Sequence, residues 1–120
     1  MFDQRFFGIG AGILGATGVG LGAFGAHYFS ARFDDRQMRN WSTAVKYQLI
    51  HAAVIIATST NPNMRKANMA WLAGSALFSG SIYLLTLDAG PRAILGPATP
   101  VGGVMMMSGW MLAGLALRKF

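Results

Sequence analysis

The sequence predicts an all-α, polytopic membrane protein with four transmembrane helices in a compact, glycine-rich bundle and both termini on the same side. Hydrophobic residues make up 53% of the 120 residues and charged residues 12%, whereas globular domains average about 25% charged residues. Several long stretches carry no charge, and about 20 apolar residues in a helix cross a hydrocarbon core of about 30 Å. Glycine is frequent inside these stretches, as expected where helices pack closely in lipid. We expect residues 1–120 to form one four-helix domain.

The first helix is expected over residues 4–29, because residues 6–29 contain eight glycines and no charged side chain. This stretch is longer than the apolar core of a signal peptide, about 7–15 residues, so we expect it to be retained. At 100° per residue, small side chains gather on one side of the helix. They form small-xxx-small pairs that let a second helix approach closely. The predicted packing face consists of Gly8, Gly12, Gly15, Gly18, Gly22 and Ala26.

Residues 30–39 carry five charged side chains of both signs and are expected to form a solvated or interfacial connector. The second helix, expected over residues 40–60, contains the most polar of the four stretches. Thr43, Tyr47 and His51 recur at i, i+4 and i+8, with Gln48 beside them. This polar stripe is expected to face the bundle interior, because polar groups in contact with lipid are costly. His51 then lies near the bilayer midplane, and two interpretations follow. It is either a neutral histidine hydrogen-bonded inside the bundle, or a residue that handles protons, a ligand or a cofactor.

The third and fourth helices are expected over residues 67–87 and 100–117. Asp88-Ala89-Gly90-Pro91 ends the third helix, since the residue before proline avoids the α region. Thr99 is expected to cap the fourth helix and Pro100 to occupy its first position, which leaves residues 88–99 as a connector. Small residues on these helices, Gly74, Gly80 and Gly109, are expected to complete the packing faces. Trp41 and Trp71 are expected in the interfacial aromatic belt.

Composition excludes several classes of protein. The chain has no cysteine, so disulfide frameworks, thiolate metal sites and cysteine nucleophiles are absent. Its net charge of +6 comes from scattered bases, with no basic patch of the kind that binds nucleic acid. Such bases attract anionic lipids, and we expect bound lipids and no nucleic-acid partner. No Asp or Glu lies inside a predicted span, which disfavours proton-coupled transport through an acidic relay.

Haem ligation by the two histidines is also disfavoured. His27 and His51 differ in depth by about 12 Å along the membrane normal, which is too far for one iron to join them. We therefore expect neither haem nor a metal centre.

Several segments resemble the transmembrane protein 256-like family, also described as domain of unknown function 423. The segments are residues 22–27 (Gly-Ala-Phe-Gly-Ala-His), Trp41 with residues 43–52 (Thr-Ala-Val-Lys-Tyr-Gln-Leu-Ile-His-Ala), residues 77–85 and Thr99-Pro100-Val101-Gly102-Gly103. The resemblance covers nearly the whole chain in order. It implies a four-helix integral membrane protein and implies little about activity, because the family is uncharacterised.

The function that we expect is non-catalytic. Small-residue packing faces and the lack of buried acids favour an accessory subunit of a large membrane complex, such as a respiratory-chain complex or ATP synthase, with other membrane subunits as partners. This interpretation favours the mitochondrial inner membrane over the bacterial plasma membrane. The alternative is a small homo-oligomeric transporter or proton carrier built around His51, Tyr47 and Gln48.

Overall fold

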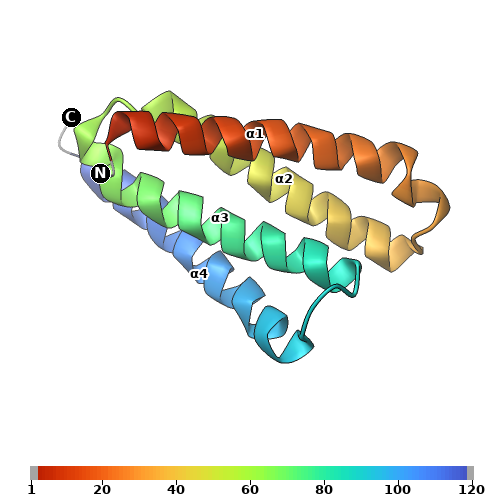
Figure 1. Ribbon diagram of the computed structural model, residues 1–120. Helices are drawn as coiled ribbons and strands as arrows, with labels where there is room; N and C mark the ends of the chain where they lie inside the picture. Colours follow the sequence, from red (N-terminus) through yellow and green to blue (C-terminus); the bar gives the residue numbers. More distant parts are fainter. Residues whose placement is uncertain (1–2, 119–120) are drawn as a thin grey trace.

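The structure, a computed structural model, describes residues 3–118 and consists of four long helices that run up and down in turn (Figure 1). The start of the first helix and the end of the last helix lie at the same end of the bundle, as predicted (Figure 1). No strand occurs among residues 3–118. The elements are α1 (Gln4–His27), η1 (Phe29–Ala31), α2 (Asp35–Thr58), η2 (Pro62–Met64), α3 (Arg65–Thr86) and α4 (Arg92–Leu117).

Three helical stretches within residues 3–118 are long and apolar enough to cross a membrane: Gln4–Ala31, Pro62–Thr86 and Arg92–Leu117. The remaining helix, α2, has 24 residues, which at 1.5 Å each gives about 36 Å, also enough to span. It is more polar, but it packs between α1 and α3, and its polar residues Gln48 and His51 are buried inside the bundle. The predicted all-α membrane fold is confirmed.

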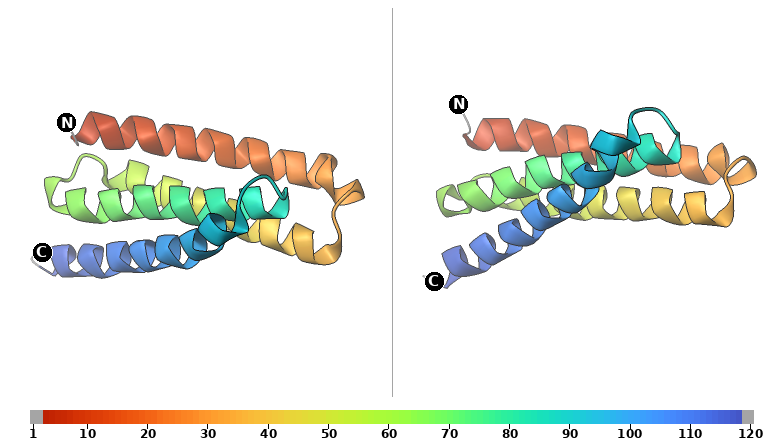
Figure 2. Two further views of the ribbon diagram at one scale, coloured as in Figure 1. Left: turned by 60° about the horizontal axis from the view of Figure 1, so that its bottom comes forward. Right: turned by 90° about the horizontal axis from the view of Figure 1, so that it is seen from below.

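The helices pack in chain order, α1 on α2, α2 on α3 and α3 on α4 (Figure 2). One apolar cluster lies where α1 begins and α4 ends; it includes Phe7, Ile55, Met64 and Trp71. A second cluster, of Trp41, Ala44 and Tyr83, lies toward the opposite end. The core therefore forms two apolar layers, separated by the polar side chains described below.

The predicted start of the second helix at Asn40 was wrong, because α2 begins at Asp35. Asp34 and Gln37 form a capping box: the Asp34 carboxylate accepts from the Gln37 amide at 2.8 Å, and the Gln37 side-chain oxygen accepts from the Asp34 amide at 3.0 Å. Asp35 adds a negative charge in the first turn, where the helix dipole favours it. Three of the five charged residues of the predicted connector, Asp35, Arg36 and Arg39, thus lie in the first turns of α2, and Asp34 caps it.

The predicted start of the fourth helix at Pro100 was also wrong. α4 begins at Arg92 and continues through Pro97 and Pro100. It continues because only the carbonyls of Ala93 and Gly96, four residues before the prolines, lose their intrahelical donor, and because lipid offers the backbone no alternative partner. The first half of α4 is bent (Figure 2), and this half contains both prolines. The connector is correspondingly shorter, and Asp88 adopts a positive φ of 55° within it. The other predicted helix ends lie within two residues of those observed.

The predicted packing face on α1 is only partly the real one. Residues that are buried on α1 follow a near-heptad spacing: Phe7, Ala11, Gly18 and Gly25. This stripe is rotated from the predicted face, because helix contact depends on matching large to small across the interface rather than on smallness alone. A β-carbon added to Gly15, Gly18 or Gly22 would meet α2, at 3.6 Å, 2.8 Å and 3.2 Å respectively. One added to Gly8 or Gly12 would meet nothing within 4 Å, and Ala26 is exposed.

The predicted small residues of α3 and α4 also divide into two groups. Gly74 lies against α4, where an added β-carbon would be 2.9 Å from the Gly102 carbonyl oxygen. Gly109 lies against the ring of Trp71. Gly80 does not pack closely, since an added β-carbon there would meet nothing within 4 Å. The closest backbone approach involves Gly102, where an added β-carbon would lie 2.5 Å from the Phe78 amide nitrogen.

The prediction that Trp41 and Trp71 belong to an interfacial belt was wrong. Both indoles are buried, with 2% and 0% of their surface exposed. Each lies over a glycine: an added β-carbon would be 2.7 Å from Trp41 at Gly25 and 2.5 Å from Trp71 at Gly109. These glycines provide the space that a large ring needs between two helices in close contact.

Candidate functional site

The predicted polar stripe of α2 divides between the core and the surface. Gln48 and His51 are buried, with 4% and 2% of their surface exposed. Thr43 is half-buried. Tyr47 remains 41% exposed, with its ring packed against that of Phe78 at a centroid distance of 5.1 Å. The stripe therefore supplies two buried polar groups to the bundle and leaves Tyr47 at its edge.

Gln48 joins three helices through hydrogen bonds. Its amide nitrogen donates to the carbonyl of Leu14 and to the hydroxyl of Thr17, both on α1 and both at 2.8 Å. Its carbonyl oxygen accepts from the Tyr83 hydroxyl on α3 at 2.6 Å. Both donors and the acceptor of Gln48 are engaged, so the residue acts as a structural link between the apolar layers.

His51 is held as a neutral imidazole by partners on both ring nitrogens. The indole N–H of Trp110, which can only donate, lies 3.2 Å from Nε2, so Nε2 accepts. Nδ1 lies 2.6 Å from the carbonyl oxygen of Tyr47, which can only accept, so Nδ1 carries the proton. Neither nitrogen of His51 is free to bind a ligand in this arrangement. Among residues 3–118, no three His, Asp or Glu side chains lie close enough together to hold a metal ion.

Other polar side chains also join neighbouring helices. Ser79 donates to the carbonyl of Ala44 at 2.7 Å, and Trp41 donates to the carbonyl of Leu21 at 2.8 Å. Thr58 donates to the side-chain oxygen of Asn68 at 2.9 Å. Such interhelical bonds contribute about 0.6 kcal/mol each on average in membrane proteins. The buried polar groups of the bundle thus serve mainly to hold the helices together.

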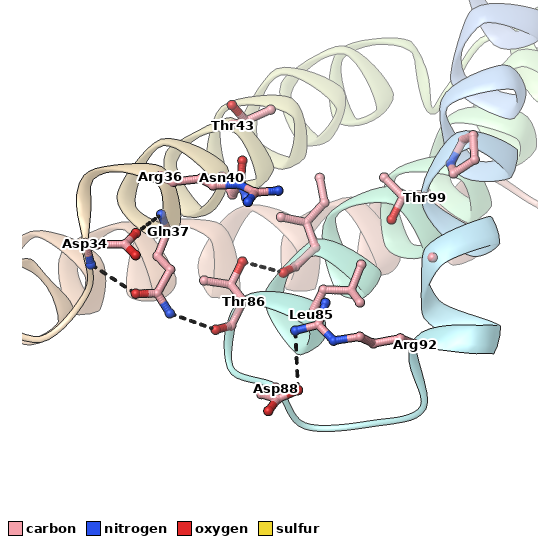
Figure 3. A pocket seen from close by; sticks show the side chains of 13 residues that line it. Asp34, Arg36, Gln37, Asn40, Thr43, Leu85, Thr86, Asp88, Arg92 and Thr99 are labelled. Atoms are coloured by element: carbon pink, nitrogen blue, oxygen red, sulfur yellow. Dashed lines mark hydrogen bonds and ion pairs between the residues drawn. The ribbon is translucent and has the colours of Figure 1, made fainter.

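A polar crevice of about 740 Å³ opens between the first turns of α2, the last turns of α3 and the first turns of α4 (Figure 3). Its floor contains Ile82, Leu85 and Thr86 of α3. It forms because α4 meets α3 closely at Gly74 and Gly102 while its bent first turns diverge from α2 (Figures 1 and 2).

The α2 wall of the crevice carries three polar side chains in a row, Arg36, Asn40 and Thr43 (Figure 3). Their i, i+4 and i+7 spacing places them on one side of the helix. Within residues 3–118, none of the three side chains has a hydrogen bond or ion pair, in contrast to Gln48 and His51. These are polar groups that a ligand could engage without breaking an existing contact.

The α4 wall is formed by Arg92, Gly96, Thr99 and Pro100. Pro100 has no N–H, so it cannot pair with the Gly96 carbonyl four residues earlier. Thr99 Oγ1 lies 2.5 Å from Ser81 Oγ, which joins this wall to α3. Arg92 is 3.4 Å from the Asp88 carboxylate, the one ion pair among the described residues. Each wall thus has one arginine at the mouth, Arg36 or Arg92, and uncharged polar side chains deeper in the crevice.

The sequence alone did not reveal the partners of the stripe. Tyr83 and Trp110 follow Gln48 and His51 by 35 and 59 residues, and no local pattern links them. The crevice was missed because residues 30–39 were assigned to a connector. The Asp34-x-x-Gln37 capping box was the available indication that α2 begins earlier and carries Arg36 on the same side as Thr43.

The family model described as "Protein of unknown function (DUF423)" matches residues 21–103. The chain belongs to the DUF423 family. The matched region contains every residue of the polar stripe and both walls of the crevice. The predicted resemblance is confirmed.

Relatives of this DUF423 protein include one from a fungus and several from bacteria, which are described as UPF0382 membrane proteins. One from Schizosaccharomyces pombe is 40% identical over 107 residues, which cover 83% of this chain and 91% of the relative. One from Staphylococcus haemolyticus is 37% identical over 117 residues, covering 90% and 94%. One from Bacillus subtilis is 36% identical over 119 residues, covering 90% and 95%. No solved structure matches the chain.

Proposed function

We propose that this DUF423 protein is a non-catalytic accessory subunit of a larger membrane complex. The observation that carries the proposal is that polar residues of its helices lie inside the bundle, whereas many of its small residues lie on the outside. The buried polar groups Gln48 and His51 are engaged inside the bundle, which leaves them no evident chemical role. Closely packing residues, in contrast, remain on the outside of α1.

The outer side of α1 carries an uninterrupted small-xxx-small series: Gly8, Gly12, Ala16 and Gly20. A β-carbon added to any of its three glycines would meet nothing within 4 Å, and Gly12, Ala16 and Gly20 are exposed. Such a series lets a second transmembrane helix approach until the backbones touch. In our proposal, a transmembrane helix of a partner subunit packs against this surface.

We further propose an energy-transducing membrane as the location, with a respiratory-chain complex or ATP synthase as the parent assembly. In a eukaryotic cell this is the mitochondrial inner membrane, and in a bacterium the plasma membrane. Relatives from a fungus and from bacteria are compatible with both. Abundant complexes of these membranes contain many small, non-catalytic helical subunits.

The proposal predicts that a bulky side chain on the outer side of α1 releases the protein from its complex. In the variant Gly12→Ile, the added side chain has open space in the isolated bundle but would separate a partner helix. After gentle solubilisation, the wild type should migrate with a large complex and Gly12→Ile as a small particle. Gly114→Ile, at an equally open glycine of α4, should migrate like the wild type.

Two results would contradict this function. The first is a wild-type protein that migrates only as a small particle or a homodimer. The second is a complex that both glycine variants leave equally intact, which would move the contact away from α1.

A transporter or proton carrier is the second candidate, and the crevice is the observation that favours it. The crevice reaches Thr43, which lies two turns from His51 on the same side of α2. This function predicts flux in reconstituted liposomes that His51→Ala abolishes, with Ser42→Ala on the exposed side of α2 as the control. Equal flux in the two variants would eliminate it.

A further inference from the structure

We propose that the crevice between α2 and α4 binds one glycerophospholipid, with the lipid phosphate against Arg36. The proposal is independent of the accessory function, because a lipid site can exist in a free or an assembled protein. It rests on the size of the crevice, the order of polar groups along its α2 wall and the availability of those groups.

The order of side chains along α2 matches the order of polar groups in the lipid. Arg36 lies at the mouth, and Asn40 and Thr43 follow one and two turns deeper, a total of about 10 Å by helix rise. In a bilayer the phosphate is outermost, the ester carbonyls lie below it and the acyl chains are deepest. A guanidinium is the preferred partner of a phosphate, while an amide and a hydroxyl can donate to ester carbonyls.

The charges at the mouth leave Arg36 available. Asp88 is occupied by Arg92 at 3.4 Å, and the carboxylate of Asp34 accepts from the Gln37 amide at 2.8 Å. Arg36 itself has no ion pair among residues 3–118. Figure 3 shows Arg36 and Arg92 entering the mouth from opposite walls. A phosphate between these walls would therefore meet a free guanidinium.

The lower part of the crevice suits the apolar part of a lipid. Ile82 and Pro100 line it, and the whole crevice has a volume of about 740 Å³, within the range of about 300–1,000 Å³ typical of ligand pockets. The hydrogen bond between Trp110 and His51 joins α4 to α2 further down. The acyl chains would leave sideways between α2 and α4, above that contact, past the exposed ring of Tyr47.

A free inorganic phosphate fits these features less well. It would engage Arg36 at the mouth but would leave the donors of Asn40 and Thr43, deeper in the crevice, without partners. The combination of a cation at the mouth and neutral donors below it therefore favours a lipid over a soluble anion.

The test is lipid binding to the purified full chain, measured by native mass spectrometry during titration with three probes. The probes are phosphatidylglycerol, a diacylglycerol with the same acyl chains, and sodium phosphate. The wild type should retain one phosphatidylglycerol per chain and bind the diacylglycerol about tenfold more weakly, as expected for loss of one hydrogen bond to a charged group. Sodium phosphate should not displace the phosphatidylglycerol.

Arg36→Gln should weaken phosphatidylglycerol binding about tenfold and leave diacylglycerol binding unchanged. Arg39→Gln is the matched control, since Arg39 lies on the same helix, is exposed and does not line the crevice. Both arginines are exposed, so both variants should fold, which thermal unfolding would verify. Equal weakening by the two variants, equal binding of the two lipids, or displacement by sodium phosphate would overturn the proposal.

Discussion

Replacing Gly102 with alanine is expected to destabilise the bundle by about 3 kcal/mol, the upper part of the range for overpacking. The added methyl group would lie 2.5 Å from the Phe78 amide nitrogen and 2.7 Å from the Gly74 carbonyl oxygen. Both atoms belong to the α3 backbone, so no side chain can turn aside to make room. Helices α3 and α4 would have to separate along their contact. Reversible unfolding of the wild type and of Gly102→Ala in mixed micelles would measure the effect.

The neighbouring Gly103 provides the control. A β-carbon added there would lie 3.7 Å from a ring carbon of Phe78, an ordinary van der Waals distance. Gly103→Ala should therefore leave stability unchanged or raise it by up to about 1 kcal/mol, the helix-propensity gain of alanine over glycine. A Gly102→Ala protein as stable as Gly103→Ala would show that α3 and α4 do not cross at this glycine.

Replacing Trp41 with alanine is expected to cost about 3–5 kcal/mol, the usual range for removing a buried tryptophan. The indole is 2% exposed and contacts Tyr83 at a ring-centroid distance of 4.7 Å. It also donates a hydrogen bond to the Leu21 carbonyl. The substitution therefore removes contacts to both α1 and α3, and the same unfolding measurement would determine the loss.

A second substitution tests whether the indole is seated on Gly25. Gly25→Ala alone should destabilise the protein, because its β-carbon would lie 2.7 Å from Trp41. In the Trp41→Ala background the same change should cost almost nothing, since the space is then vacant. The two effects should thus be strongly non-additive. Additive effects would place the indole elsewhere.

The fold could be predicted because hydropathy and the lengths of apolar runs decide it directly. The boundaries that failed are those where two rules compete. Pro97 and Pro100 would end a helix in water, but in lipid the backbone has no other partner and α4 continues. At α2, the density of charges suggested a connector, and the capping box of Asp34 and Gln37 instead begins the helix.

The site was predictable only in part. The helical period of 3.6 residues places Gln48 and His51 on the same side of α2, and polar residues in a span face inward. This correctly predicted that both side chains are buried. Their partners Thr17, Tyr83 and Trp110 depend on the rotation of three other helices, which a pattern in one helix does not determine. The same limit explains the packing face of α1, where Gly8 and Gly12 fit a packing motif but face away from the bundle.

The intermediate polarity of α2 has a consequence for biogenesis. This helix is not apolar enough to partition readily into the bilayer by itself, yet its Trp41 and Gln48 find acceptors on α1, at Leu21 and Leu14. Because α1 leaves the ribosome first, those acceptors are already in place when α2 arrives at the translocon. The first half of the chain is thus suited to enter the membrane as a helical hairpin rather than one segment at a time.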